Sequence, residues 1–158
     1  AYLRAYKQEF DLDFTIFRFF NTYGPKQSTD FVMSKFIEAA LSDKDITIYG
    51  DGSQTRTFCY VDDNVEACLN AFYTHRFVND VINVGNDHET SILELAQLVK
   101  KILNSKSNIV HLPALKEGDM TRRCPDIGKM KILLNRELTP LETGMERVIE
   151  VFRNKKKK

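Results

Sequence analysis

The sequence has no tryptophan and is poor in cysteine, proline and glycine, with 3, 4 and 7 of these residues among its 158. The cysteines, Cys59, Cys68 and Cys124, are odd in number and far apart, which argues against a disulfide framework or a zinc site. No run approaches the roughly 18 consecutive apolar residues of a membrane helix, and no segment resembles a signal peptide. We therefore expect reduced thiols in a cytoplasmic protein without a membrane partner.

An excess of charge of one sign is also missing. The chain has 23 Lys and Arg against 22 Asp and Glu, and residues 155–158 are all lysine. The rest of the chain is thus slightly acidic, which argues against a nucleic-acid partner. We interpret residues 1–154 as one domain and residues 155–158 as a solvated basic tail.

Several familiar catalytic and binding motifs are absent. The seven glycines never take the GxGxxG spacing of a dinucleotide fingerprint, and neither a P-loop nor a GxSxG elbow occurs. His75, His88 and His111 lack metal-ligand spacing, so we interpret them as surface or structural residues and expect no metal site.

The hydrophobic pattern alternates between strand and helix periods. It predicts strands at 14–20, 45–49, 56–61, 81–84 and 109–112, and helices at 1–10, 31–41, 62–72, 92–103, 126–135 and 141–154. The run at 14–20 predicts a buried strand, and Ser91 with Glu94 predicts a capping box before the fourth helix. This order of elements indicates an α/β fold.

Two segments could carry chemistry. The first, Arg18–Pro25, ends a strand abruptly in the polar turn Asn-Thr-Tyr-Gly-Pro. Ligands of open α/β sheets bind beyond the carboxyl ends of strands, although a plain strand-to-loop turn fits these residues equally well. The second, Ile48–Asp62, predicts a glycine-rich hairpin that brings Tyr49 near Arg56. An aromatic ring can stack on a base and a guanidinium can bind phosphate, but a surface hairpin with a solvated arginine also fits.

Taken in order, these segments and a late Arg-Cys-Pro-Asp-Ile at 123–127 resemble the extended short-chain dehydrogenase/reductase family. The resemblance is to its NAD-dependent epimerase/dehydratase branch, which holds UDP-glucuronate decarboxylases, dTDP-glucose 4,6-dehydratases and UDP-glucose 4-epimerases. It covers nearly the whole chain and is closest to the decarboxylases. It implies the C-terminal strands of a Rossmann-like sheet plus the small α/β substrate-binding lobe.

The resemblance also implies roles for individual residues. Phe20 and Thr22 would face the nicotinamide side of NAD, and a UDP- or dTDP-sugar would contact Asn21, Phe31, Val32, Lys35, Thr47, Ile48, Tyr49, Arg56 and Arg123. In that set the asparagine would contact phosphate or sugar, residues 47–49 would border the base, and the two arginines would clamp the diphosphate. The helix start at 31–35 would offer N–H groups to the diphosphate. Whether Arg122 or Arg123 meets phosphate is open.

The chain also departs from the family pattern. The loop at 26–30 is shorter than in the decarboxylases and lacks their extra arginine, and residues 116–119 read Lys-Glu-Gly-Asp where epimerases have Arg-x-Gly-Asp. No tyrosine is followed by lysine four residues later, so we expect no catalytic residue in this chain. The opening helix has no N-cap signal, which indicates a cut. We expect that a preceding half of the protein makes most of the contacts with NAD, and that this chain alone is inactive.

Three functions fit these expectations. The parent protein could be an enzyme that oxidises the sugar at C4 to a 4-keto intermediate, with this chain as its substrate lobe. The chain could instead be a non-catalytic sugar-nucleotide-binding module, or an interaction domain that kept the fold. The resemblance implies a homodimer. The reaction type, the base and the sugar are left open.

Overall fold

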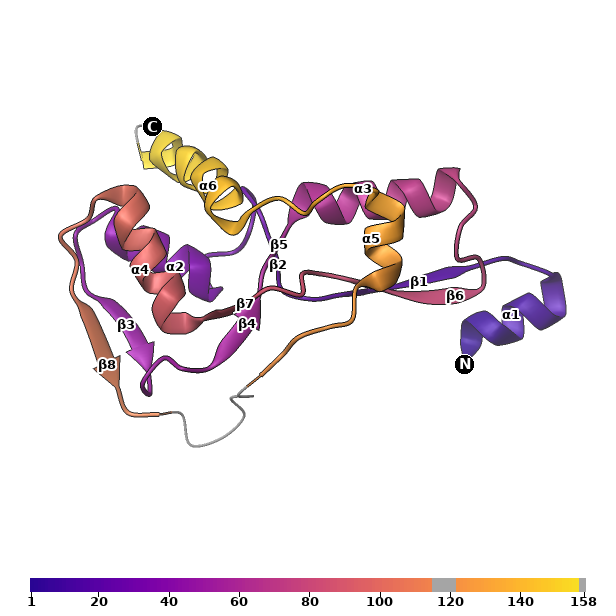
Figure 1. Ribbon diagram of the computed structural model, residues 1–158, viewed down its shortest axis with the longest axis horizontal. Coiled ribbons are helices and arrows are strands. Elements are labelled where there is room, and N and C mark those ends of the chain that lie inside the picture. The colour runs from indigo at the N-terminus through magenta and orange to yellow at the C-terminus, as the bar shows by residue number, and fades with distance from the viewer. Residues whose placement is uncertain (115–121, 157–158) are drawn as a thin grey trace.

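The computed structural model describes residues 1–114 and 122–156, with side chains through 154, and shows two groups of elements joined at a narrow middle (Figure 1). One group holds α2 (Val32–Ala40), β3 (Ile46–Tyr49), α4 (Ile92–Leu103), β8 (Ile109–Leu112) and α6 (Leu141–Lys156). The other holds α1 (Tyr2–Phe10), β1 (Thr15–Phe19), α3 (Val61–Tyr73), β6 (Asp80–Val84) and α5 (Gly128–Leu134). Between them lie β2 (Thr22–Tyr23), β4 (Thr55–Thr57), β5 (Cys59–Tyr60) and β7 (Glu89–Ser91).

Parallel pairing dominates among the described strands. β1 pairs with β6, β2 with β5 and β3 with β8, all in parallel, whereas β4 and β7 are antiparallel. Parallel neighbours need crossover connections, and helices supply them here. The predicted α/β class is confirmed. Within this part of the chain no helix is long and apolar enough to cross a membrane.

The fourth predicted helix is confirmed with its cap. The Ser91 hydroxyl accepts a hydrogen bond from the backbone N–H of Glu94 at 3.1 Å, and the Glu94 carboxylate accepts one from the Ser91 N–H at 2.7 Å. These two bonds satisfy donors that a helix start otherwise leaves unpaired. The helix ends before Asn104, which takes a left-handed conformation with φ 49°.

Two hydrophobic clusters match the two groups. The first is built by α2, β3, α4 and α6 around Ile37, Ile46, Leu95, Val99, Met145 and Ile149. The second is built by α3, β6 and α5 around Ala67, Ala71, Ile82, Val84, Met130 and Leu133. Neighbouring residues of β5 divide between them, because Cys59 belongs to the second cluster and Tyr60 to the first.

The predicted glycine-rich hairpin is wrong. β3 pairs with β8 and β4 with β7, and the single strand expected at 56–61 is two short strands separated by Phe58. The loop between β3 and β4 binds the start of α4, where the N–H of Leu93 donates to Gly52 O at 3.1 Å. Gly50 and Gly52 have φ of 71° and 79°, which lets the chain turn toward α4 instead of folding back on β3.

The first strand is less buried than predicted. No residue of β1 is fully buried, and Phe19 is 57% exposed. Among the described residues β1 has only β6 as a pairing neighbour, which leaves its other edge uncovered. The two-residue β2 and three-residue β7 were not predicted, because strands this short carry no readable alternation.

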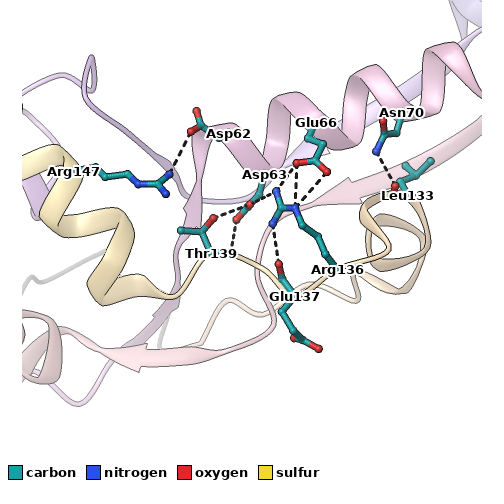
Figure 2. Close-up of polar contacts among 9 residues, drawn as sticks. All are labelled: Asp62, Asp63, Glu66, Asn70, Leu133, Arg136, Glu137, Thr139 and Arg147. Atoms are coloured by element: carbon teal, nitrogen blue, oxygen red, sulfur yellow. Dashed lines mark hydrogen bonds and ion pairs between the residues drawn. The ribbon is translucent and has the colours of Figure 1, made fainter.

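A buried carboxylate connects α3 to the segment before α6. Asp63, in the first turn of α3, has no exposed surface. Its oxygens accept hydrogen bonds from Arg136 Nη2 at 2.8 Å, Thr139 N at 2.9 Å and Thr139 Oγ1 at 2.9 Å (Figure 2). Arg136 also pairs with Glu66 one helical turn along. Every close partner of the buried charge is thus a donor, as its burial requires.

Replacing Arg136 by methionine should lower the free energy of unfolding by about 3 kcal/mol, because it removes one partner of a buried charge. Urea unfolding followed by circular dichroism measures this change. Lys101→Met is the matched control, since it breaks an ion pair with Glu142 whose side chains are 73% and 49% exposed. That control should cost below about 1 kcal/mol, and equal losses in the two variants would contradict the assignment.

A glycine lets α6 pack tightly on the strands beneath it. A methyl group at Gly144 would lie 2.9 Å from Cζ of Tyr23 and 3.0 Å from Cδ2 of Tyr60. Both rings are buried, and they meet edge to face with centroids 5.5 Å apart. The same burial raises the pKa of the Tyr23 hydroxyl above its usual value. Only a residue without a side chain fits at this point of the helix.

Gly144→Ala should therefore destabilise the fold by about 1–3 kcal/mol through overpacking, although the same change in an open helix stabilises by about 1 kcal/mol. Thermal unfolding measures the sign directly. Tyr23→Phe removes the oxygen nearest to the new methyl group and should recover part of the loss in the double variant. A rise in stability for Gly144→Ala alone would refute the close contact.

Candidate functional site

A cavity of about 560 Å³ opens where the two groups of elements meet. It collects residues from distant parts of the chain. These parts are the end of β1, the turn into β2, the start of α2, β3, β4, the start of α4 and the segment at 123. Its lining is part apolar and part polar: Phe19, Asn21, Thr22, Gln27, Phe31, Val32, Met33, Phe36, Thr47, Ile48, Tyr49, Gln54, Arg56, Phe58, Ile92 and Arg123. Apolar walls with a few convergent polar groups are typical of small-molecule sites.

Asn21 lies in the connection between β1 and β2. Its φ is 39°, a left-handed conformation that asparagine tolerates better than most residues, and its carbonyl accepts a hydrogen bond from the N–H of Cys59 at 3.2 Å. The side-chain Nδ2 is buried without a partner among the described residues. An unsatisfied buried donor costs about 1–3 kcal/mol, so this amide favours a polar ligand.

Thr22 is held from two sides. Its hydroxyl accepts a hydrogen bond from Asn64 Nδ2 at 2.6 Å, and its carbonyl accepts one from Gln27 Nε2 at 2.9 Å. Asn64 is 2% exposed and sits in the first turn of α3, next to Asp63. The same helix turn therefore holds the cavity strand β2 and the segment before α6.

The start of α2 faces the cavity through Phe31, Val32 and Met33. Phe31 is the N-cap and supplies no side-chain hydrogen bond to the first turn. The helix start therefore keeps donor groups and a positive partial charge next to the cavity. This arrangement suits an anionic ligand.

β3 and β4 supply an aromatic ring and a cation. Thr47, Ile48 and Tyr49 line the cavity from β3, and the Tyr49 side chain is 47% exposed. Arg56 lines it from β4, is half-buried, and donates from Nη1 to Thr55 O at 2.7 Å. Tyr49 and Arg56 thus line the same cavity, although no hairpin joins their strands.

The two late arginines have different surroundings. Arg123 lines the cavity, whereas Arg122 binds Glu89 with Nε and Nη2 at 2.8–3.0 Å. Hydrogen bonds from Arg122 and from Thr55 lower the pKa of Glu89 to about 2. Glu89 is thus ionised at neutral pH and engages Arg122. The geometry favours Arg123 as the arginine that meets a ligand.

Two predicted residues lie outside this lining. The backbone N–H of Phe20 donates to Val84 O at 2.9 Å, and its side chain packs against Gly85. Lys35 lies on an exposed face of α2, in a separate hollow with Glu38 and Phe152. The remaining predicted contacts line the cavity together, and the residue-by-residue roles stay predictions. The residues at 116–119 and the last two lysines lie outside the described part of the chain.

The sequence-based prediction missed part of the lining. Seven lining residues were not predicted: Phe19, Gln27, Met33, Phe36, Gln54, Phe58 and Ile92. Gln54 lies inside the second motif, and its Nε2 donates to Tyr49 O at 3.1 Å, so its position in the motif was an available signal. Phe19 lies inside the first motif and Phe58 inside the second, so their positions were available signals as well. Gln27, Met33, Phe36 and Ile92 lie outside both motifs.

Metal and thiol chemistry have little support in the described residues. No group of three His, Cys, Asp or Glu side chains there could hold a metal ion. Cys59, Cys68 and Cys124 are all free thiols, and burial raises the pKa of Cys59 to about 12. A thiol with this pKa is protonated at neutral pH and makes a poor nucleophile.

The chain is similar in sequence and fold to several known proteins. UDP-glucuronic acid decarboxylase 1 of Danio rerio is 39% identical over 151 residues, which cover 94% of this chain and 35% of the decarboxylase. The crystal structure of UDP-glucose 4-epimerase with UDP-glucose from Thermotoga maritima has a TM-score of 0.88 and 34% identity. The match covers 98% of this chain and 50% of that one.

A third relative is UDP-glucuronic acid 4-epimerase from Bacillus cereus, solved in complex with UDP-glucuronic acid and NAD. Its TM-score is 0.84 at 31% identity, and the match covers 96% of this chain and 48% of that one. The chain thus spans half or less of the length of these proteins. The family model for the NAD dependent epimerase/dehydratase family matches residues 1–85. This chain belongs to the NAD-dependent epimerase/dehydratase family.

Proposed function

We propose that this chain binds a nucleotide-diphosphate sugar for an NAD-dependent enzyme that acts through a 4-keto sugar intermediate. The observation that carries the proposal is the single cavity that Asn21, Tyr49, Arg56 and Arg123 share. These residues come from four segments of the chain and together bring three kinds of group: an amide, an aromatic ring and two guanidinium groups. A nucleotide sugar needs all of them at once.

The cavity can be divided by chemistry. Thr47, Ile48 and Tyr49 form an apolar and aromatic wall on which a pyrimidine base can stack. Arg56 and Arg123, with the start of α2, offer positive charge to the two phosphates. The buried amide of Asn21 then reaches the sugar or the phosphate next to it. Lys35 can add only a long-range contribution from its own hollow.

The described residues fit one edge of an NAD molecule. Thr22 lines the cavity beside Phe19, so a nicotinamide ring can lie against this strand end, with Phe20 as backing for the turn. NAD supplies a hydride acceptor when bound. No glycine fingerprint and no Tyr-x-x-x-Lys pair occur in this sequence, so we assign most of the cofactor contacts and the catalytic base to another part of the parent protein.

The specific reaction that we propose for the parent protein is UDP-glucuronate decarboxylation. The Danio rerio decarboxylase is 39% identical to this chain, while the epimerases above share 31–34% identity and the same fold. Assays of the parent protein with NAD should release CO2 from UDP-glucuronate. Interconversion of UDP-glucose and UDP-galactose without decarboxylation would instead assign the epimerase reaction. We further propose that the parent protein is cytoplasmic and forms a homodimer. Light scattering of the parent protein would test the dimer.

Arg56→Ala should weaken binding of UDP by about 3 kcal/mol, or roughly 100-fold in Kd, because a charge-assisted pair with phosphate is lost. Isothermal titration calorimetry of UDP into the parent protein measures this loss. Binding should become less dependent on salt in the variant, since one ion pair fewer is screened.

The matched control is Arg153→Ala, which removes an exposed arginine of α6 outside the cavity lining. It changes net charge equally and should leave the Kd for UDP within about two-fold. Unchanged UDP affinity in Arg56→Ala would refute the phosphate assignment. Absence of UDP binding by the unmodified parent protein would favour an interaction domain that kept only the fold.

A further inference from the structure

Glu89 touches the neighbours of both cavity arginines. Its Oε1 accepts a hydrogen bond from the Thr55 hydroxyl at 2.7 Å, and Thr55 directly precedes Arg56. Its two oxygens also accept three hydrogen bonds from Arg122, which directly precedes Arg123. One carboxylate therefore joins two segments that are 67 positions apart at the residues next to the cavity.

The carboxylate is the fixed member of this cluster. Glu89 belongs to β7, where it stands opposite Thr57 in the antiparallel ladder with β4, and its side chain is 27% exposed. The Arg122 side chain is 70% exposed and belongs to a segment without regular secondary structure. A paired strand holds its backbone more firmly than an irregular segment does, so the strand positions the arginine and not the reverse.

Further contacts hold the arginine segment along the same edge. Cys124 Sγ lies 3.6 Å from Asp87 O, to which it can donate, and Asn83 Nδ2 donates to Asp126 O at 2.8 Å. The segment is thus attached just before and just after Arg123. The residues on either side of Arg123 are therefore bonded to β6, to β7 and to the turn between them, and the Arg123 side chain lines the cavity.

We propose that Glu89 is a positioning residue for phosphate binding, which holds Arg123, through Arg122, opposite Arg56 at the cavity. This inference rests on the proposed function, since it assumes that the two cavity arginines bind a diphosphate. Glu89 itself does not line that cavity, and a carboxylate there would repel the phosphates. It acts by ordering two cations that mutual repulsion would otherwise separate.

Glu89→Gln and Arg122→Gln test the proposal from the two sides of the cluster. Each should weaken UDP binding by about ten-fold, comparable to one charge-assisted hydrogen bond, in calorimetric titrations of the parent protein. The double variant should lose no more than either single variant, because both disable the same link. Uridine has no phosphate for Arg123 to bind. Its Kd, measured by competition with UDP, should therefore be equal in all variants.

Glu142→Gln is the matched control, because it breaks an exposed ion pair between Glu142 of α6 and Lys101 of α4 and should leave the UDP affinity unchanged. Equal losses for UDP and uridine in Glu89→Gln would overturn the proposal, since they mean a general distortion of the cavity. So would additive losses in the double variant. If the unmodified protein binds UDP and Glu89→Gln binds it equally well, the positioning role alone fails; if the unmodified protein does not bind UDP, the proposed function fails with it.

Discussion

The hydrogen bonds of the buried Asp63 carboxylate hold the two halves of this structure together. Asp63 belongs to α3, which packs in the cluster with β6 and α5, while its partners Arg136 and Thr139 lead directly into α6 of the other cluster. A charge without exposed surface tolerates few arrangements of its donors. The adjacent Asn64 holds Thr22 at the cavity, so the position of the site follows from the same helix turn.

A second carboxylate joins an irregular segment to a regular element in the same way, and it lies closer to the cavity. Glu89 joins β4 to the segment at 122, as Asp63 joins α3 to the segment at 136–139. Irregular segments have no ladder or helix of their own to define them, and charged hydrogen bonds to a regular element take that role. The cavity therefore receives one arginine from a strand and one from an irregular segment. The two arginines lie far apart in the sequence and belong to different motifs.

Residues that share a sequence motif largely stay together in space at the cavity. The Asn-Thr-Tyr-Gly-Pro turn places Asn21 and Thr22 at the cavity, and the second motif places Tyr49 and Arg56 there. The sequence-based prediction also named Phe20 and Lys35, which the structure places outside the lining. Phe19 at the end of β1 lines the cavity, whereas the N–H of Phe20 donates to Val84 O and its side chain packs against Gly85. Lys35, which was expected at the site from the resemblance, lies on an exposed face of α2.

The sequence by itself determined the order and type of the longer elements, because α4 carries its own cap and each helix its own apolar face. It also determined the family, since the motifs keep their order along the chain. Only the tertiary structure decided that β3 pairs with β8 and β4 with β7, and that Arg122 binds Glu89 while Arg123 faces the cavity. Those outcomes depend on contacts between residues 30 to 70 positions apart, and no local pattern of side chains encodes which distant strand or carboxylate will be the partner.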